Sequence, residues 1–278
     1  MYDKVEEIGY STIHHGPYNN RIYLMAYNDK DEDHITNWLD LLANNRGYSK
    51  IIAKLPHKIV PKFIQSGFTK EGEIQGYYKG CSTCFLLSKY LDANRLEVKD
   101  KLLIDNVIEV AKSKKYKDLP PLKPEFSIRQ MTQADAENMA KVYQEVFETY
   151  PFPICDAEYI KQTMITHVKY FGVTYQGELI GLSSCEMNKE EQNVEMTDFA
   201  ILPKARNYKL AKQLLHEMEK AMQEAQMKTF YTIARATSYA MNATFSSMGY
   251  SFGGTLYNNT QIAGQIESMN LWYKANSV

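Results

Sequence analysis

Residues that form disulfides or ligate metals are scarce in this chain of 278 residues, which has four cysteines and six histidines. So few cysteines in a chain of this length exclude a fold held together by disulfides. Cys81 and Cys84 have the CxxC spacing of redox and zinc sites, but no second cysteine pair completes a zinc site. The segment after this pair predicts a strand, whereas a redox pair sits at a helix N-terminus, so we expect packing cysteines. His14 and His15 lack nearby metal-type partners, and we expect a local structural role for them and no bound metal.

An excess of charge of one sign is also lacking. The chain has 32 Lys and Arg residues and 33 Asp and Glu residues, which gives a net charge of −1. A surface without excess positive charge does not favour nucleic acid as a partner. No apolar run approaches the roughly 18 residues of a membrane span, and the charged residues 1–9 do not resemble a signal peptide. We therefore expect a cytoplasmic protein without a nucleic-acid or membrane partner.

Proline is concentrated in one segment, residues 119–124, which holds three of the nine prolines. Three prolines in six residues cannot continue a helix and favour extended backbone. The chain is longer than a usual single domain, and its 44% hydrophobic content is enough for packed cores. We therefore divide it at this linker into an N-terminal α/β domain, residues 1–122, and a catalytic domain, residues 123–278.

Alternating helical and strand-like periodicity predicts a mixed α/β fold for the C-terminal part. Met139, Val142, Tyr143 and Val146 recur at helical spacing after Asp135, which indicates an amphipathic helix. The predicted order is β-α-α-β-β-β-α-β-α-β, a mixed sheet with helices against its faces. The strands are predicted at residues 126–130, 170–175, 178–187, 195–202, 229–236 and 268–274, and the helices from residue 132 to a break at 150–153, at 157–167, at 211–226 and up to Gly249.

The N-terminal part contains a partial echo of this pattern. IIAK at residues 51–54 precedes a segment that ends in FIQSGF at 63–68, and TIAR at 232–235 precedes one that ends in FSSMGY at 245–250. A closing aromatic strand follows in each case. Two short matches at nearly equal spacing also arise by chance, but we favour a smaller N-terminal domain that is a degenerate copy of the C-terminal fold.

A strand, a basic loop and a helix follow one another across residues 200–211. The first turn of such a helix has N–H groups without backbone partners at the positive end of the helix dipole, which suits a pyrophosphate. Arg206, Lys209 and Lys212 add positive charge. The hexapeptide RNYKLA at residues 206–211 resembles the acetyl-CoA pyrophosphate loop of the GNAT acetyltransferase superfamily, Arg/Gln-x-x-Gly-x-Gly/Ala, with Lys209 in place of the first glycine.

The order of elements also resembles that superfamily from about residue 126 to residue 274. The resemblance implies a GNAT-type mixed sheet with flanking helices, and acetyl-CoA as co-substrate without a metal. The residues that it implies for binding acetyl-CoA are Ile201, Leu202, Arg206, Asn207, Tyr208, Lys209, Leu210, Ala211 and Ser238.

Five separated segments carry a narrower resemblance over the whole chain. They are FETYPFP at residues 147–153, EMTDF at 195–199, TIARA at 232–236, NNT at 258–260 and ESMNLWYK at 267–274. These segments are similar to those of the β-lysine N-acetyltransferase family. The resemblance implies that the chain acetylates the side-chain amine of β-lysine, and that the product, Nε-acetyl-β-lysine, serves as a compatible solute.

Acetylation of an alkyl amine requires a base, because an amine with a pKa near 10.4 is only about one part in a thousand neutral at pH 7.4. Glu195, six residues before Ile201, resembles the position of the general-base glutamate in the histone-acetylating branch of the superfamily, although a solvated strand residue is the alternative. Asp198 is the rival base. Strict alternation along a strand puts Glu195 and Asp198 on opposite faces, unless a bulge re-aims one of them.

The proton donor for the departing CoA thiolate stays open. The superfamily often uses a tyrosine four residues before the Gly-aromatic pair, where this chain has Phe245, and Ser238 stands where many members carry an asparagine. Tyr239 is one candidate acid. Alternatively the thiolate leaves unaided, since thiol pKa values lie near 8.5.

A site for β-lysine needs an acidic group for the non-reacting ammonium and donors for the carboxylate. Each candidate also suits a purely structural role, and the paired asparagines also suit a turn. The candidates are Glu186, Asp198 and Glu267 for the ammonium, Arg235, Asn258 and Asn259 for the carboxylate, and Tyr150 and Phe152 for the pocket walls.

Two other functions remain open from the sequence. Some superfamily members with tandem folds transfer aminoacyl or peptide groups, and the substitutions at Lys209 and Phe245 also suit a non-catalytic acyl-CoA sensor. The oligomeric state is open as well, with a homodimer as one candidate.

Overall fold

The computed structural model describes residues 2–116 and 118–276, and the N-terminal half combines strands with mostly short helices. Lys50–Pro56 forms a strand and Val60–Gln65 forms a helix, within the segment whose sequence resembles that of residues 232–250. The elements of this half are β1 (Lys4–Ile8), β2 (Ser11–Gly16), β3 (Arg21–Ala26), η1 (Asp29–Asp31), α1 (Ile35–Arg46), β4 (Lys50–Pro56), η2 (His57–Ile59), α2 (Val60–Gln65), β5 (Thr69–Tyr78), β6 (Ser82–Tyr90), α3 (Ala93–Leu96) and α4 (Lys101–Lys112).

The C-terminal half follows the predicted order with one additional strand. Its elements are β7 (Phe126–Gln130), η3 (Gln133–Asp135), α5 (Ala136–Val146), α6 (Ala157–Thr166), β8 (Val168–Tyr175), β9 (Glu178–Asn188), β10 (Asn193–Ile201), η4 (Pro203–Tyr208), α7 (Leu210–Glu224), β11 (Thr229–Arg235), α8 (Tyr239–Ser247), β12 (Ser251–Ile262) and β13 (Gln265–Ala275).

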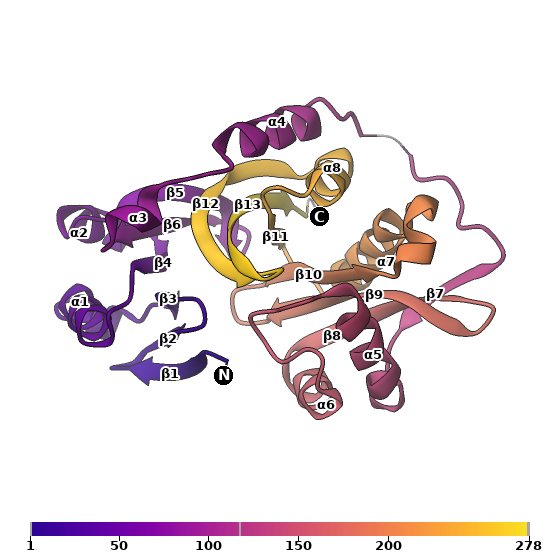
Figure 1. The fold of residues 1–278 in the computed structure, drawn as a ribbon, viewed down its shortest axis with the longest axis horizontal. Helices are drawn as coiled ribbons and strands as arrows, with labels where there is room; N and C mark the ends of the chain where they lie inside the picture. Colours follow the sequence, from indigo (N-terminus) through magenta and orange to yellow (C-terminus); the bar gives the residue numbers. More distant parts are fainter. Residues whose placement is uncertain (1, 117, 277–278) are drawn as a thin grey trace.

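The additional strand, β12, is absent from the sequence-based prediction. Gly253, Gly254, Asn258 and Asn259 interrupt the alternating pattern that marks a strand. The structure accommodates them at two register shifts between β12 and β13, one before Gly254 and one before Thr260. Bulges of this kind bend a strand, and Figure 1 shows β12 and β13 strongly bent.

All strands of the described residues belong to one sheet, in the order β1-β2-β3-β4-β6-β5-β12-β13-β11-β10-β9-β8-β7. The N-terminal strands lie on the left of Figure 1, β7, β8 and β9 lie on the right, and the bent hairpin of β12 and β13 lies between them. β5 pairs with β12 in antiparallel fashion where Gly72 lies opposite Gly254. The two halves are therefore joined through the backbone.

The strand order repeats between the halves. Counted toward the junction, it is β1-β2-β3-β4-β6-β5 in one half and β8-β9-β10-β11-β13-β12 in the other, with β7 as an extra edge strand. The pairs β3–β4 and β10–β11 are parallel, at equivalent places in the two series. This repetition supports a duplicated fold, while the boundary between residues 122 and 123 stays a prediction.

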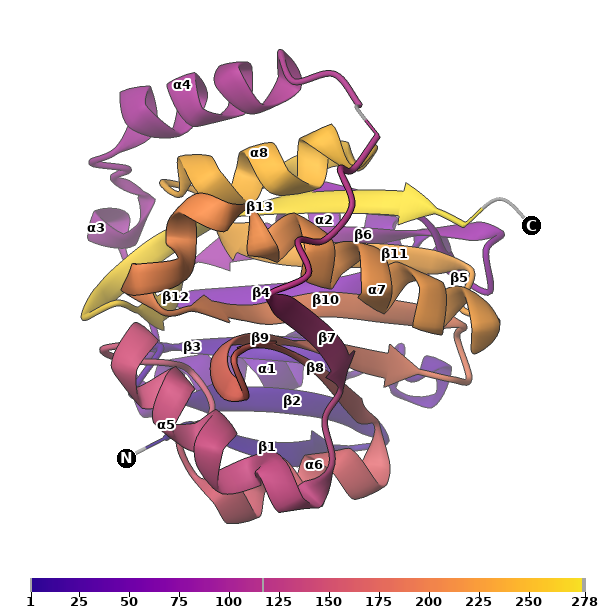
Figure 2. The ribbon, with the colours of Figure 1, turned by 90° about the vertical axis from the view of Figure 1, so that its right-hand side faces the viewer.

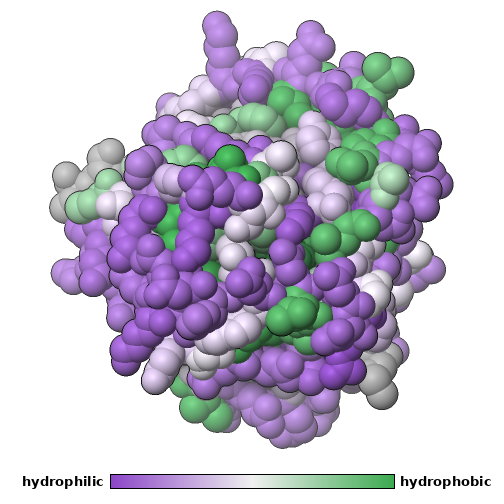
Figure 3. Space-filling view, turned by 90° about the vertical axis from the view of Figure 1, so that its left-hand side faces the viewer, coloured by the Kyte–Doolittle hydropathy of each residue, from purple (hydrophilic) through white to green (hydrophobic). Residues whose placement is uncertain are grey.

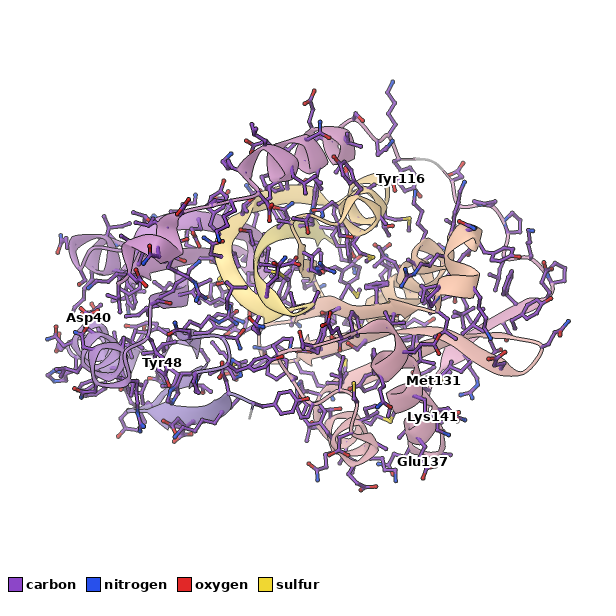
Figure 4. The ribbon with its side chains drawn as sticks, viewed as in Figure 1. Asp40, Tyr48, Tyr116, Met131, Glu137 and Lys141 are labelled. Carbon is purple, nitrogen blue, oxygen red and sulfur yellow. The ribbon has the colours of Figure 1, made fainter. Side chains whose placement is uncertain are left out.

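Amphipathic helices cover the sheet of the C-terminal half. On α5, Met139 and Tyr143 are fully buried, whereas Glu137 and Lys141 point away from the sheet (Figure 4). On α7, the buried residues recur at helical spacing and join the same apolar core; they are Leu210, Leu214, Leu215, Met218 and Met222. Burial of these stripes explains why the helical periodicity was readable from the sequence.

α4 links the halves on the outside of the molecule. It lies along α8 of the C-terminal half (Figure 2) and buries Ile104, Val107 and Ala111. From there, residues 118–123 run without regular structure to β7, in agreement with their proline content.

The surface of the N-terminal half is mostly hydrophilic on the face shown in Figure 3, with apolar residues in separate small patches. Among the described residues, no helix has the length and apolar character needed to cross a membrane.

The closeness of β5 and β12 predicts a large loss of stability for Gly254→Ala. Gly254 has a φ of +134°, and a Cβ there would lie 2.2 Å from the carbonyl oxygen of Glu71 and 2.6 Å from Cα of Gly72. Gly177→Ala is the matched control, because Gly177 also has a positive φ, +86°, but open space around its Cα. We expect losses in the free energy of unfolding of about 3 kcal/mol for Gly254→Ala and about 1 kcal/mol for Gly177→Ala. Equal losses for the two variants in urea unfolding would show that the close approach of β5 to β12 adds nothing to the cost of the Gly254→Ala substitution.

Candidate active site

β10 and β11 separate in the middle of the C-terminal sheet. Their parallel pairing ends where Glu195 lies opposite Tyr231, although β10 continues to Ile201 and β11 to Arg235. A cavity of about 550 Å³ opens where the strands diverge. It is lined by the end of α5, by β10 and β11, by the first turn of α7 and by one side of α8.

A bulge in β10 aligns two acidic residues that strict alternation would separate. The β9–β10 register shifts between Thr197 and Ala200, and Asp198 has a φ of +55°. Glu195 lies opposite Glu186, and Thr197 lies opposite Ser184, so these side chains share one face. The Ser184 hydroxyl donates to Oδ2 of Asp198 at 2.6 Å. Asp198 is thus on the same face as Glu195.

Asp198 is held by hydrogen bonds from two directions. It is 6% exposed, and its Oδ1 accepts a hydrogen bond from the Tyr150 hydroxyl, while its Oδ2 accepts the one from Ser184. Burial raises the pKa of Asp198, and these two donors oppose the rise. Tyr150 belongs to the connection between α5 and α6, so this connection closes over the acidic face.

Glu195 has the electrostatic environment of a base. Burial raises the pKa of Glu195 to about 7, the ammonium of Lys54 opposes this rise, and the charge of Asp198 adds to it. Burial together with the charges of Asp198 and Glu195 raises the pKa of Glu186 well above its ordinary value. A carboxylate that titrates near neutral pH suits general-base catalysis.

The N-terminal half supplies aromatic and basic residues to the same face. Tyr77 of β5 lies with its ring 5.5 Å from that of Tyr231. Lys54 of β4 lies over the rings of Tyr77 and Tyr23, with Nζ 5.3 Å and 5.8 Å from their centroids. Sequence reasoning missed these three residues, because no local pattern connects β3, β4 and β5 to β10.

The basic loop before α7 ends in a residue with the left-handed backbone conformation that glycine adopts most readily. Lys209 has a φ of +58° and immediately precedes α7, whose first turn has no side-chain cap. This left-handed conformation favours glycine, so Lys209 keeps the shape of the loop pattern while changing its side chain. Arg206 is exposed, and its Nε donates to the carbonyl oxygen of Ile201 at 3.3 Å.

The residues predicted for acetyl-CoA divide into two groups. Leu202 is buried, Asn207 is exposed, and Tyr208 packs on Phe126 with 5.1 Å between ring centroids. The others line the cavity, and they are Ile201, Arg206, Lys209, Leu210, Ala211 and Ser238.

Tyr239 does not line the cavity. Its hydroxyl donates to Oδ1 of Asn106 on α4 at 2.6 Å, and its side chain is 42% exposed. This contact directs Tyr239 toward α4, because the helical phase of α8 turns it outward, and its role as the acid stays a prediction. Phe245 and Thr244 of α8 instead line the cavity, and Thr244 is a hydroxyl that sequence reasoning missed.

Of the other predicted substrate residues, Arg235 lines the same cavity as Asp198, whereas Asn258 lines a separate cavity. Arg235 forms a two-pronged ion pair with Glu267, at 2.8 and 2.5 Å, which satisfies both groups. Nδ2 of Asn258 donates to the carbonyl oxygens of Arg95 and Glu97, so Asn258 anchors α3.

Asn259 and Phe152 meet the N-terminal half. Asn259 is buried, with an Oδ1 that has no hydrogen-bond partner in the described parts of the chain, and the ring of Phe152 lies 5.0 Å from that of His14. Cys81 and Cys84 carry free thiols. Within residues 2–116 and 118–276, no group of three acidic, cysteine or histidine residues could hold a metal ion.

Comparison with known proteins identifies the family. The profile of the acetyltransferase (GNAT) family matches residues 139–250. The chain is 38% identical over 272 residues to the β-lysine N(6)-acetyltransferase of Methanococcus maripaludis, with 98% of each chain covered. It is 32% identical to the enzyme of the same name from Methanosarcina mazei, covering 86% of this chain and 96% of the relative. It is 31% identical to the N-acetyltransferase YodP of Bacillus subtilis, with 95% of each covered. The chain therefore belongs to the β-lysine N-acetyltransferase family of GNAT acetyltransferases.

Proposed function

We propose that this acetyl-CoA-dependent N-acetyltransferase transfers the acetyl group to the ε-amine of β-lysine and gives Nε-acetyl-β-lysine, which serves as a compatible solute. The observation that carries the proposal is the buried acidic face beside the cleft of the diverging strands, with the pKa of Glu195 near 7. An ammonium group is attracted to such a face, and a base of this pKa can remove its proton. The names of two relatives support β-lysine as the acceptor.

The cleft between β10 and β11 suits acetyl-CoA. Past Glu195 and Tyr231 the two strands do not pair with each other, so their facing backbone edges are free for the amide groups of pantetheine. At the mouth of the cleft, Arg206, Lys209 and Lys212 supply positive charge beside the start of α7 for the pyrophosphate. We assign Ile201 and the residues of the 206–211 loop to cofactor binding on this basis.

Glu195 acts as the base in the proposed reaction, directly or through a water molecule. It takes a proton from the ε-ammonium, and the neutral nitrogen attacks the thioester carbonyl carbon. The nitrogen then loses its second proton to solvent as the carbon–sulfur bond breaks, which leaves the neutral amide and the CoA thiolate. Asp198, fixed by Tyr150 and Ser184, keeps negative charge near the ammonium. Phe245 has no proton to give, so the thiolate, whose conjugate acid has a pKa near 8.5, leaves unaided.

We expect Arg206→Glu to weaken acetyl-CoA binding about 10- to 100-fold in Kd, because it replaces a cation at the phosphates with an anion. Lys220→Glu is the matched control, since it changes the net charge equally on an exposed part of α7 away from the cavity. Calorimetric titration of acetyl-CoA measures both. Equal affinity of Arg206→Glu and the native protein would remove the loop from the binding site.

We expect kcat/KM for the amine to rise with pH through an inflection near 7, because Glu195 accepts a proton only above its raised pKa. Glu195→Gln keeps the side-chain shape, should lower the rate about 10²- to 10⁴-fold at pH 7 and should abolish the inflection. The loss should shrink at high pH, where more amine is already neutral. The exposed Glu190→Gln is the control.

Asp198→Asn decides between the two carboxylates. If it abolishes the inflection and Glu195→Gln does not, Asp198 is the base. Full activity of both variants at pH 7 would mean that solvent takes the proton.

Mass spectrometry of the product tests the function itself. We expect incubation with acetyl-CoA and β-lysine to add one acetyl group at the ε-nitrogen, the position printed in the names of two relatives. Binding of acetyl-CoA without acetylation of any free amine would favour the sensor, and acetylation of peptides alone would favour the peptide acyltransferase.

The setting of the reaction also remains a proposal. We place it in the cytoplasm, without a nucleic-acid or membrane partner, and we keep a homodimer as the candidate assembly. Light scattering of the purified protein measures its oligomeric state.

A further inference from the structure

A second polar cluster, which the proposed chemistry does not use, lies on the inner side of the sheet in the N-terminal half. His14 of β2 and Arg21 of β3 are 1% and 5% exposed. Three of their side-chain nitrogens have no hydrogen-bond partner among the described residues: both ring nitrogens of His14 and Nε of Arg21. A buried polar group without a partner is costly, typically about 1–3 kcal/mol, so three such atoms in two neighbouring side chains call for an explanation.

The strand register brings these side chains together. His14 lies opposite Tyr23 in the β2–β3 pairing, and Arg21, two residues before Tyr23, shares its face because side chains alternate along a strand. Burial lowers the pKa of His14 to about 4, and the charge of Arg21 contributes. His14 is therefore neutral at physiological pH, with one N–H to donate.

Arg21 reaches across to the C-terminal half. Its Nη1 donates to the carbonyl oxygen of Asn259 at 2.5 Å and to Oγ1 of Thr260 at 3.1 Å. Both partners are on β12, and Oδ1 of Asn259 is itself buried without a partner. The cluster thus contains two free donors, Nε–H of Arg21 and the N–H of His14, and two free acceptors, the other ring nitrogen of His14 and Oδ1 of Asn259.

Arg21 has no counter-ion in the part of the chain that the structure describes. It forms no ion pair with a carboxylate of residues 2–116 and 118–276, and the carboxylate that acts on it over a longer distance, Asp3, accepts hydrogen bonds from the backbone N–H groups of Tyr18 and Asn19. A buried cation without an opposite charge is unfavourable, and the two hydrogen bonds of Arg21 and the Tyr23 ring 5.4 Å from its guanidinium carbon offset only part of this cost. An anion bound at Nε of Arg21 would remove this cost.

The cluster is connected to the acidic face by one short segment. Phe152 packs on His14 with 5.0 Å between ring centroids, while Tyr150, two residues earlier, donates to Asp198. The same segment is fixed to the β12–β13 turn, because the backbone N–H of Gly264 donates to Oγ1 of Thr149 at 2.8 Å. This segment therefore contacts Asp198 through Tyr150 and His14 through Phe152.

We propose that His14, Arg21 and Asn259 form the subsite for the far end of the acceptor: Nε–H of Arg21 and the N–H of His14 bind its carboxylate, and Oδ1 of Asn259 accepts from its second ammonium. This inference rests on the proposed function, and it makes the N-terminal half the part that selects an amino acid over a plain amine. The sequence-based choice of Arg235 and Asn258 for the carboxylate gives way to these residues, since the former is paired with Glu267 and the latter anchors α3.

The test compares β-lysine with its carboxamide, which keeps both amines and loses the negative charge. We expect native kcat/KM to favour β-lysine by about 10- to 100-fold, the range for charge-assisted hydrogen bonds. His14→Leu removes no existing hydrogen bond and should reduce this preference severalfold or more, while turnover of the carboxamide stays near the native value. Arg21→Lys keeps a charge for the Asn259 carbonyl but loses the Nε donor, and should act in the same direction if His14→Leu does not fold. His57→Leu and Arg46→Lys, both at exposed positions of the N-terminal half, are the controls.

Two results would overturn the subsite while leaving the proposed function intact. One is equal use of β-lysine and its carboxamide by the native protein. The other is an equal loss for both acceptors in each folded variant, which would make the residues structural. Failure of the native protein to acetylate either acceptor would instead contradict the proposed function, and the subsite with it.

Discussion

The backbone contact between β5 and β12 is the constraint on which the rest of the molecule depends. At Gly254 the two strands approach so closely that a single added carbon would meet the carbonyl oxygen of Glu71 at 2.2 Å. This approach makes one sheet from two similar halves, and it brings Tyr77 of one half against Tyr231 of the other. The face that holds Glu195 is therefore a joint surface, and a C-terminal half alone would have it open on one side.

Charge is unevenly distributed along this joint surface. Glu186, Glu195 and Asp198 crowd one region, where burial disfavours their ionised forms, and Arg21 lies in another region without a counter-ion. Both arrangements cost folding free energy, since a desolvated charge is stabilised only by an opposite charge or by hydrogen bonds. Such costs are typical of binding sites, where the ligand supplies what the protein lacks.

The sequence predicted most helices and strands of the C-terminal half, because their apolar residues repeat with the period of each element. It could not predict β12, whose glycines and asparagines hide its period. A bulge near Asp198 was raised only as an alternative to strict alternation, and the structure shows that it turns Asp198 toward Ser184. Lys209 was recognised as a departure from the loop pattern, but only the structure shows that it keeps a left-handed backbone. Tyr23, Lys54 and Tyr77 reach the site through the pairing of distant strands, and no local pattern records such pairing. His14 also meets its neighbours through the pairing of strands, and the sequence predicted only a local structural role for it.

The junction also has a consequence for how the chain folds as it is made. β5 is complete early in synthesis, but its partner β12 follows roughly 180 residues later, which takes on the order of 10–40 s at common translation rates. During that time the free edge of β5 is a template for pairing with another chain. Lys70, Glu71 and Glu73 place charges along this edge strand, the device by which natural sheets discourage such pairing. Gly72, which later pairs with β12, also lowers the intrinsic preference of this segment for a strand, so β5 pairs less readily with other chains before β12 is made.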